Sequence, residues 1–259
     1  MSILKKYTLI TGGTEGIGLE LAKLFAKDKH NLIIVARNEK KLKHVQEEIE
    51  RDYKVKVEII SADLSIKESY EKIYDFVEKK NYFVDNLINN AGLGCFGYFK
   101  DLDINKQDTL IKVNVLALTN LTHYFLGKMI EAKEGGILNV ASTAAFSSGP
   151  KMSTYYASKA FVLSLTEAIH EEVKGTGVKV CCLCPGAVKT GFQKKSKIVK
   201  NEKAASLLMN PKEVARCAYE GYKKGNVIII PGTKNKLLVL ANKFIPRSLA
   251  RKIVLSANK

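Results

Sequence analysis

The chain alternates short apolar runs with longer segments whose apolar residues recur at helical spacing. The apolar runs lie at residues 7–10, 31–36, 55–60, 86–89, 136–141, 178–184 and 227–230. The helical segments between them cover about 19–29, 40–51, 67–80, 108–132, 154–174 and 211–223. Strands that are apolar on both faces and separated by helices predict a parallel sheet covered on both sides. We therefore expect an α/β, doubly wound Rossmann-type fold of about seven strands, with its ligand beyond the strands' carboxyl ends.

The first predicted strand runs into a glycine-rich turn, residues 11–18, which opens the first predicted helix. Gly12, Gly16 and Gly18 allow a tight turn, a close approach to a pyrophosphate and packing of the helix on the strand, while the helix N-terminus faces the anion. By itself the pattern is weak, because any strand-to-helix turn can use glycine.

Tyr155 and Lys159 are four residues apart on a predicted helix, so their side chains share a face, and Ser142 lies shortly upstream. A nearby ammonium group favours the phenolate of a tyrosine whose pKa is otherwise near 10, so we expect Lys159 to lower the pKa of Tyr155. Tyr156 has only Ala160 at the corresponding position. Taken singly, Tyr155 and Lys159 are more typical of a helix surface pair, and Ser142 of a serine that shapes a loop. Together, at the ends of consecutive elements, they indicate one catalytic cleft.

Length and composition predict one domain over residues 1–259, because no linker or repeat divides the chain. A hydrophobic content of 46% and a mean hydropathy of −0.07 are ordinary for a soluble protein. The N-terminus has no signal-peptide pattern and no apolar run is long enough to span a bilayer, so we expect a cytoplasmic protein.

Five cysteines fit a reducing compartment. Strand alternation places Cys181 on the face opposite Cys182 and Cys184, so these three cannot converge on one metal ion. Cys95 and Cys217 are isolated in the sequence. We expect reduced thiols and no metal site.

The formal net charge is +16, which would suit a nucleic-acid partner. The lysines are spread over many predicted helix faces, however, and no nucleic-acid motif accompanies them, so we expect no nucleic-acid partner. The tail, residues 234–259, is basic and amphipathic and contains no acidic residue. It suits peripheral contact with an anionic membrane surface, and equally a tail packed on its own domain or in an oligomer interface.

Several further motifs follow the glycine loop in order. They are Asp63 within 62–64, Asn89-Asn90-Ala91-Gly92, Asn114 in a helix, Ser142 after a strand, Tyr155-x-x-x-Lys159, and residues 185–190, which read Pro-Gly-Ala-Val-Lys-Thr. With these marks the chain resembles the short-chain dehydrogenase/reductase family over nearly its whole length, and within it an NADP-preferring, ketoreductase-like branch.

The resemblance implies hydride transfer between a nicotinamide cofactor and a ketone or secondary alcohol. In this family pattern Ser142 hydrogen-bonds the carbonyl oxygen, Tyr155 protonates it, Lys159 also holds the nicotinamide ribose, and Asn114 supports a water relay. A homodimer or homotetramer is also implied. The expected cofactor-binding residues are Gly12, Thr14, Glu15, Gly16, Ile17, Gly18, Arg37, Asp63, Leu64, Asn90, Ala91, Gly92, Tyr155, Lys159, Pro185, Gly186, Val188 and Thr190.

Cofactor choice depends on the end of the second strand, where NAD-binding relatives carry an acidic residue. Here Ala36 is neutral, and Arg37 after it can grip a phosphate. We therefore expect NADP(H). NAD(H) stays open, because Glu15 lies where some NADP-binding members place a base, and Arg37 would serve equally as a surface cation.

The substrate pocket is expected to be mostly apolar, with a lid over residues 191–210. Its expected lining is Leu93, Cys95, Phe96, Thr143, Phe146, Met152 and Phe192. No cationic clamp for a carboxylate is evident, which favours a moderately bulky hydrophobic carbonyl of keto ester, steroid-like or 3-oxoacyl type. The alternative is a non-catalytic nucleotide-sensing or membrane-associated binding protein on the same fold. The intact set of Asn114, Ser142, Tyr155 and Lys159 argues against it.

Overall fold

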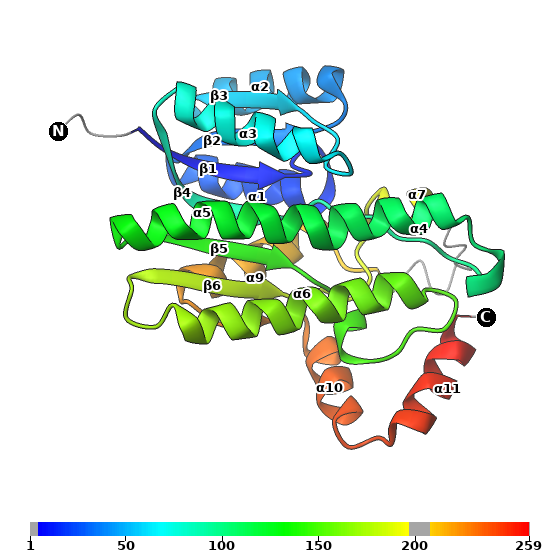
Figure 1. Cartoon of the computed structure of the whole chain (residues 1–259). Helices are drawn as coiled ribbons and strands as arrows, with labels where there is room; N and C mark the ends of the chain where they lie inside the picture. The colour runs from blue at the N-terminus through cyan, green and yellow to red at the C-terminus, as the bar shows by residue number, and fades with distance from the viewer. Residues whose placement is uncertain (1–4, 197–207, 259) are drawn as a thin grey trace.

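The computed structural model describes residues 5–196 and 208–258. Its centre is a seven-stranded sheet in the order β3-β2-β1-β4-β5-β6-β7, with every neighbouring pair parallel (Figure 1). The strands are β1 Lys5–Thr11, β2 Asn31–Ala36, β3 Val57–Ser61, β4 Tyr82–Asn89, β5 Gly135–Val140, β6 Val178–Leu183 and β7 Ile228–Ile229. The order reverses between β1 and β4, which is where a doubly wound sheet opens a crevice for its ligand. The predicted fold class is confirmed.

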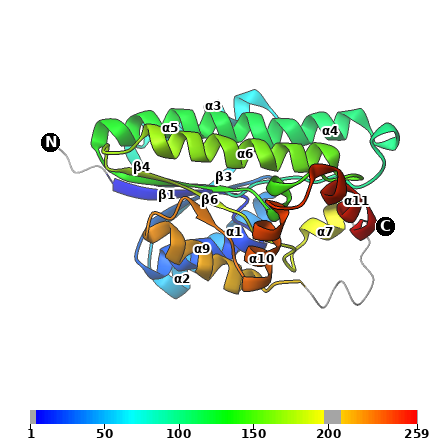
Figure 2. The same ribbon diagram turned by 90° about the horizontal axis from the view of Figure 1, so that it is seen from below.

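Helices cover both faces of the sheet (Figure 2). One face carries α1 Gly16–Lys27, α2 Glu39–Tyr53 and α9 Pro211–Lys223, and the other carries α3 Lys67–Lys79, α4 Ile104–Ile111, α5 Leu118–Ala132 and α6 Ser153–Glu172. Consecutive residues Ile33 and Ile34 of β2 belong to different apolar cores, one on each side of the sheet. Burial on both faces explains why the strands read as continuous apolar runs.

The long helix expected at 108–132 differs from a regular α-helix. It begins four residues earlier, at Ile104, where the Asp103 side chain caps it by accepting a hydrogen bond from the Asn105 amide. Between α4 and α5 the turns widen into a π-helical segment, η2 Lys112–Ala117, which contains Asn114. Such π-helical turns occur frequently at functional sites. Apolar periodicity does not reveal this one, because the residues on both sides of it keep their helical pattern.

The cysteines of β6 lie as strand alternation predicts. Cys181 belongs to the core beneath α1 and α9, whereas Cys182 and Cys184 belong to the cluster beneath α6. The sulfur atoms of Cys182 and Cys184 are 3.7 Å apart. All five thiols are free.

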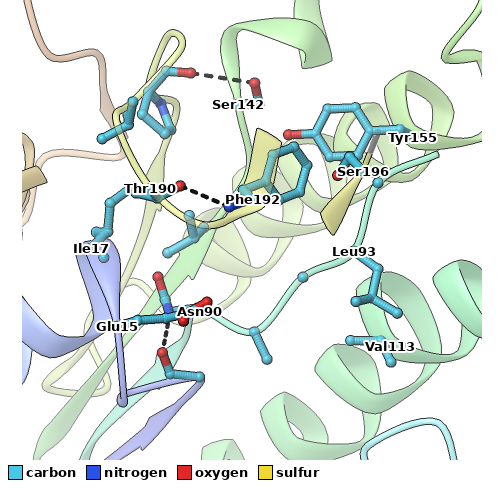
Figure 3. A pocket seen from close by; sticks show the side chains of 18 of the residues that line it. Glu15, Ile17, Asn90, Leu93, Val113, Ser142, Tyr155, Thr190, Phe192 and Ser196 are labelled. Atoms are coloured by element: carbon cyan, nitrogen blue, oxygen red, sulfur yellow. Dashed lines mark hydrogen bonds between the residues drawn. The ribbon is translucent and has the colours of Figure 1, made fainter. Parts of the chain in front are cut away.

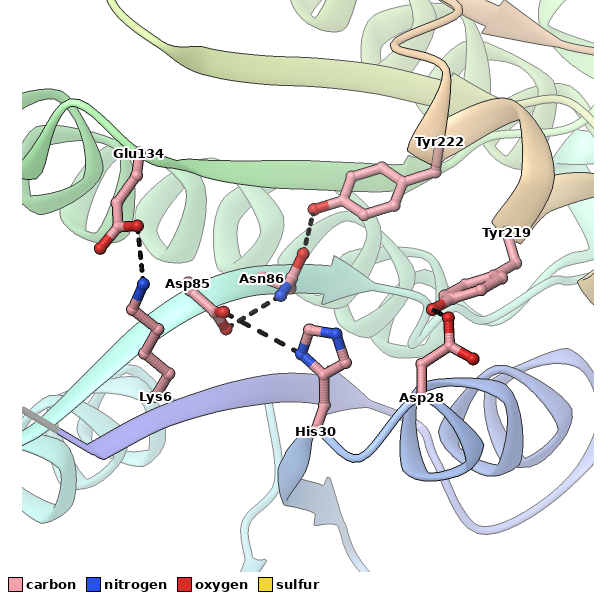
Figure 4. Close-up of polar contacts among 8 residues, drawn as sticks. All are labelled: Lys6, Asp28, His30, Asp85, Asn86, Glu134, Tyr219 and Tyr222. Atoms are coloured by element: carbon pink, nitrogen blue, oxygen red, sulfur yellow. Dashed lines mark hydrogen bonds and ion pairs between the residues drawn. The ribbon is translucent and has the colours of Figure 1, made fainter.

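Polar contacts tie α1, α9 and β4 together near the amino ends of the strands (Figure 4). The Tyr222 hydroxyl donates to Asn86 Oδ1 at 2.6 Å, and the Tyr219 hydroxyl donates to Asp28 Oδ2 at 2.7 Å. Beside them His30 lies 4.0 Å from Asp85. These contacts lie at the edge of the sheet opposite the strands' carboxyl ends, so they fasten the scaffold without occupying the crevice.

Shorter elements complete the carboxyl side of the sheet. They are η1 Phe99–Asp101, η3 Thr143–Phe146 and α7 Phe192–Lys195, and the last lies in the segment expected to form a lid. Residues 197–207 of that expected lid lie outside the described residues. The C-terminal segment forms α10 Thr233–Asn242 and α11 Arg247–Ala257, which project beyond the layers around the sheet (Figure 1). None of the helices in the described ranges is long and apolar enough to cross a membrane.

Candidate active site

A cleft of about 900 Å³ runs along the carboxyl ends of the strands. Its walls come from the glycine loop, from the segments after β2, β3, β4, β5 and β6, and from the first turns of α6 and α7. Figure 3 shows Glu15 and Ile17 in one part of this space and Ser142 and Tyr155 in another. The volume falls within the range usual for ligand sites, so the cleft can hold a ligand that spans the crevice.

The glycine loop is locked to the segment after β4 across the point where the strand order reverses. The Thr11 hydroxyl oxygen accepts from the amides of Asn90 and Ala91, at 3.1 and 3.0 Å. The Asn90 side-chain amide donates back to the carbonyl oxygens of Thr11 and Gly12, each at 3.0 Å. Gly12 adopts a φ of +65°, which favours glycine. These bonds hold the N-terminus of α1 open toward the cleft.

Gly18 does not line the cleft. A Cβ atom at this position would lie 2.4 Å from the Asn90 side-chain nitrogen and equally close to the Gly12 carbonyl oxygen. Its contribution is therefore close packing of α1 beneath the loop, which is one of the roles that glycine was expected to serve here.

Charged side chains surround the end of the cleft beside β2. Arg37 and Lys41 both line it, next to Ala36 at the strand end. The Lys41 amino group pairs with Glu15 at 3.1 Å, and an Arg37 guanidinium nitrogen lies 3.9 Å from Asp63. Burial alone would raise the pKa of Asp63, but hydrogen bonds from Ser65 and the Arg37 charge lower it overall. This end of the cleft thus combines two basic side chains with two carboxyl groups.

At the other end, Ser142 and Tyr155 face a common space (Figure 3). Ser142 caps η3 by accepting from the Ala144 amide at 3.1 Å, and its hydroxyl lies 3.3 Å from the Pro185 carbonyl oxygen. The Phe192 ring lies against the Tyr155 ring, with centroids 5.4 Å apart. Two hydroxyl groups beside an apolar ring form a site that can bind and protonate a carbonyl oxygen.

Lys159 lies one turn along α6 from Tyr155 and is only 5% exposed. Its amino group donates to the Val140 carbonyl oxygen at 2.7 Å and lies 5.9 Å from the centre of the Tyr155 ring. Burial lowers the pKa of Lys159 to about 8. The residue can therefore change charge near neutral pH.

The pKa of Tyr155 differs from the expectation. Burial raises the pKa of its phenol to about 12, and the facing Ser142 side chain opposes this shift only in part. Lys159 does not reverse it, because its amino group is directed to the Val140 carbonyl oxygen. The phenol is therefore held in its protonated form, which is the form that donates a proton to a carbonyl.

Asn114 lies beneath the cleft and does not line it. Its side chain accepts from the Leu93 amide at 2.8 Å and donates to the Leu93 carbonyl oxygen at 2.9 Å and to the Ser158 hydroxyl at 3.0 Å. Ser158 in turn donates to the Tyr155 carbonyl oxygen at 2.7 Å. The π-helical turn thus joins the segment after β4 to the first turns of α6, and so positions Tyr155. A water relay through Asn114 stays a prediction.

The expected substrate residues separate into two groups. Leu93, Thr143, Met152 and Phe192 line the cleft. Three do not. The Cys95 thiol faces the Lys106 carbonyl oxygen, the Phe96 ring faces Lys151, and Phe146 packs against the apolar cluster beneath α6. Each of them follows a cleft-lining segment in sequence, but the chain turns its side chain away from the cleft.

The remaining expected cofactor residues all line the cleft: Gly12, Thr14, Glu15, Gly16, Ile17, Arg37, Asp63, Leu64, Asn90, Ala91, Gly92, Tyr155, Lys159, Pro185, Gly186, Val188 and Thr190. A Cβ atom on Gly16 would lie 2.8 Å from the Thr190 side chain, so the glycine loop and the segment after β6 approach closely without a side chain between them. Backbone exposed in this way at the start of α1 fits the pyrophosphate of a dinucleotide.

Sequence reasoning missed several residues of the cleft wall. Tyr156 lines it although it has no partner on the helix face, and Gln193, Ser196 and Asn258 line it as well. Asn258 belongs to the C-terminal tail and is far in sequence from every other described residue of the wall. Lys41 carried a usable signal, because it lies in the first turn of α2, four residues after Arg37.

Residues 6–201 match the short chain dehydrogenase family. Over 249 residues the chain is 30% identical to a 7beta-hydroxysteroid dehydrogenase of Mediterraneibacter gnavus, and the match covers 92% of each protein. It is 29% identical to a very-long-chain 3-oxoacyl-CoA reductase of Rattus norvegicus, over 99% of this chain and 80% of that protein. The chain belongs to the short-chain dehydrogenase/reductase family of oxidoreductases, as its motifs predict.

A solved structure of a short-chain dehydrogenase from Sphingobium yanoikuyae in complex with NADPH shares the fold. It superposes with a TM-score of 0.83 at 28% identity and covers 93% of this chain and 94% of that one. The cleft described above therefore belongs to a fold in which a relative binds a nicotinamide cofactor.

Proposed function

We propose that the protein is an NADP(H)-dependent reductase of a moderately bulky, hydrophobic carbonyl compound. The observation that carries the proposal is a single cleft that joins the glycine loop at one end to Ser142, Tyr155 and the buried Lys159 at the other. A nicotinamide cofactor, when bound, supplies the hydride. The residues of the chain supply binding, orientation and the proton.

The carbonyl oxygen of a substrate would accept hydrogen bonds from Ser142 and Tyr155, whose hydroxyl groups face the same space. Because burial raises the pKa of Tyr155 to about 12, the phenol carries its proton throughout the neutral range. Tyr155 gives this proton to the oxygen as charge develops there. The Lys159 ammonium lies beside the phenol ring and stabilises the negative charge that proton donation leaves on Tyr155.

Preference for NADP(H) is supported by the charges at the β2 end of the cleft. No acidic side chain follows β2 directly, because Ala36, Arg37 and Asn38 occupy those positions. Arg37 can bind a phosphate, and Lys41 adds a second cation while pairing with Glu15, the acid that would otherwise repel a phosphate. Structurally similar dehydrogenases have been solved with NADPH and with NAD, so the comparisons support a nicotinamide cofactor and the preference for NADP(H) rests on these charges.

The substrate class rests on the apolar side chains opposite Ser142. Leu93, Met152 and Phe192 line that part of the cleft, and among the described residues that line it the only cation is the buried Lys159. The two relatives are named for a steroid and a long-chain 3-oxoacyl thioester, both of them hydrophobic carbonyl or alcohol compounds. We propose keto esters, steroid-like ketones and 3-oxoacyl compounds as the class to test.

The test is an NADPH-oxidation screen across these carbonyl compounds, repeated with NADH. Tyr155→Phe is expected to lower turnover by about 10²- to 10⁴-fold, the usual contribution of a general acid. Tyr124 lies on α5 outside the cleft, and its hydroxyl hydrogen-bonds Glu78 of α3, so Tyr124→Phe serves as the matched control. Near-normal turnover of Tyr155→Phe would refute the assigned chemistry.

The cofactor assignment has its own test. Arg37→Glu should shift the ratio of kcat/KM for NADPH over NADH toward NADH by at least about tenfold, because a carboxylate repels a 2′-phosphate and can bind the ribose hydroxyls. A wild-type protein that prefers NADH would contradict the assignment while leaving the carbonyl chemistry intact.

Localisation and assembly are further parts of the proposal. Five free thiols support a cytoplasmic protein. Exposed apolar residues on the long helices support a homodimer or homotetramer: Ile104, Ile111, Leu116 and Phe161 are 61%, 41%, 47% and 40% exposed. Light scattering on the purified protein tests the assembly, and a monomer with these residues exposed would contradict it.

A further inference from the structure

The C-terminal hairpin, which we define as residues 233–258, projects from the body near the carboxyl edge of the sheet (Figures 1 and 2). It consists of α10, α11 and the turn between them. Phe244 in the turn is 80% exposed, and Leu238 and Leu237 on α10 are 68% and 61% exposed. Further exposed apolar residues on the same hairpin are Leu240, Leu249 and Ile253. Large apolar side chains concentrated in this way mark an interaction surface.

The hairpin also concentrates positive charge. Its basic residues, all exposed, are Lys234, Lys236, Lys243, Arg247, Arg251 and Lys252. None of the six lies within 4.0 Å of an acidic partner in the part of the chain that the structure describes. The sequence contains no Asp or Glu beyond Glu220. Among the described residues, the surface therefore presents cations without an acidic partner beside exposed leucines and a phenylalanine.

Amide side chains hold the hairpin to the rim of the cleft. Asn242 donates to the Phe146 carbonyl oxygen, and Asn258 donates to the Pro150 carbonyl oxygen at 2.9 Å. Asn258 also lines the cleft itself. Within the two helices the buried apolar residues are only Val239 and Ala250. The inner side of the hairpin is thus attached largely through polar contacts, and most of its apolar surface faces outward.

Three kinds of partner fit an exposed basic and apolar surface, and the chemistry separates them. A second copy meeting this surface across a two-fold axis would bring six cations against six cations. The phosphates of a nucleic acid would pair with the cations, but the leucines and Phe244 would stay without an apolar environment. An anionic lipid surface offers negative headgroups for the cations and an acyl boundary for the apolar side chains.

We propose that the C-terminal hairpin docks on an anionic membrane surface, with Phe244 and the α10 leucines inserted at the headgroup boundary. The rim that Asn258 joins to the hairpin then lies close to the lipid. A hydrophobic carbonyl compound dissolved in the membrane could enter the cleft from that side. Docking itself does not depend on the proposed reaction, and its test below requires no turnover.

The test is co-sedimentation of the full-length protein with vesicles of phosphatidylcholine alone and with about 30% phosphatidylserine, at about 0.15 M salt. The wild-type protein should bind the anionic vesicles and not the neutral ones, and added salt should release it. Leu238→Ser with Phe244→Ser should weaken binding at least about tenfold, because two inserted side chains are lost. The combination Lys243→Gln, Arg247→Gln and Arg251→Gln should weaken it by at least the same factor.

The matched control is Lys79→Gln, Lys80→Gln and Lys224→Gln. It removes the same net charge, but these exposed residues lie at the C-terminal ends of α3 and α9, at the amino edge of the sheet and away from the hairpin. The control should bind within about twofold of the wild type. Thermal unfolding of each variant shows that the body remains folded.

Three outcomes would overturn the proposal. One is a wild-type protein that stays in the supernatant with anionic vesicles. Another is an equal loss of vesicle binding in the control variant, which would show that the total charge of the protein, and not the hairpin, determines binding. The third is duplex DNA retention, or a change of oligomeric state in Leu238→Ser with Phe244→Ser, in a protein that does not bind the vesicles. Either of those results would assign the hairpin to a different partner.

Discussion

The charge on Lys159 should make the activity fall at alkaline pH. The side chain is 5% exposed, and its amino group donates a hydrogen bond to the Val140 carbonyl oxygen. Lowering its pKa from 10.5 to about 8 corresponds to about 3 kcal/mol of cost for holding the charged form inside the protein. This cost is present at neutral pH, where Lys159 is charged.

The assay is kcat/KM for NADPH measured from about pH 6 to 10, which reports ionisations of the free enzyme. Because the carbonyl reaction needs the ammonium beside Tyr155, kcat/KM should be level at low pH and then fall with an apparent pKa of about 8. One pH unit above that value about a tenth of the enzyme carries the charge, so kcat/KM should fall about tenfold. Tyr155 does not cause this fall, because its pKa is raised to about 12.

Stability gives an independent measure of the same burial. The folded-state pKa of Lys159 is depressed, so between about pH 8 and 10.5 the unfolded chain binds more protons than the folded one. The buried charge of Lys159 therefore destabilises the fold below about pH 8. The unfolding free energy rises as the pH increases through that window, because Lys159 loses its charge in the folded protein. Lys159→Met removes a cost of about 3 kcal/mol and a hydrogen bond worth about 1 kcal/mol, so we expect a gain of about 2 kcal/mol in unfolding free energy at neutral pH.

Two results together would refute this reasoning. One is a kcat/KM profile that stays level to about pH 9.5. The other is a Lys159→Met variant that is no more stable than the wild type in urea at neutral pH. A level profile alone would limit the effect of the buried charge to stability. An unchanged stability alone would limit it to catalysis.

Further predictions concern residues that support the cleft from below. Asn114→Leu removes three side-chain hydrogen bonds, two to Leu93 and one to Ser158, and should lower the unfolding free energy in urea by about 3 kcal/mol. A loss below about 1 kcal/mol would show that this π-helical turn does not depend on them. Gly18→Ala places a methyl group 2.4 Å from the Asn90 side-chain nitrogen, so the glycine loop must shift. Titration followed by NADPH fluorescence should show affinity at least about tenfold weaker, and unchanged affinity would contradict close packing at this position.

Much of the cleft could be predicted from the sequence because its residues lie at the ends of regular elements. Apolar runs separated by helical periodicity predict a parallel sheet, and a parallel sheet brings the carboxyl ends of its strands to one edge. The residues after β1, β4 and β5 could therefore be assigned to one cleft before any coordinates. This prediction was wrong for Cys95, Phe96 and Phe146. They lie outside the regular strands and α-helices, where tertiary contacts rather than hydrophobic periodicity set the direction of a side chain.

The sequence by itself determined that Tyr155 and Lys159 share a helix face and that glycines open the N-terminus of α1, since both follow from local backbone geometry. Only the tertiary structure decided the pKa of Lys159, the π-helical turn at Asn114 and the place of Asn258 in the cleft wall. These depend on which distant segments exclude water from a side chain or donate hydrogen bonds to it. Burial and long-range contacts arise only when the chain folds, whereas the residues that share a helix face are set by their spacing in the sequence.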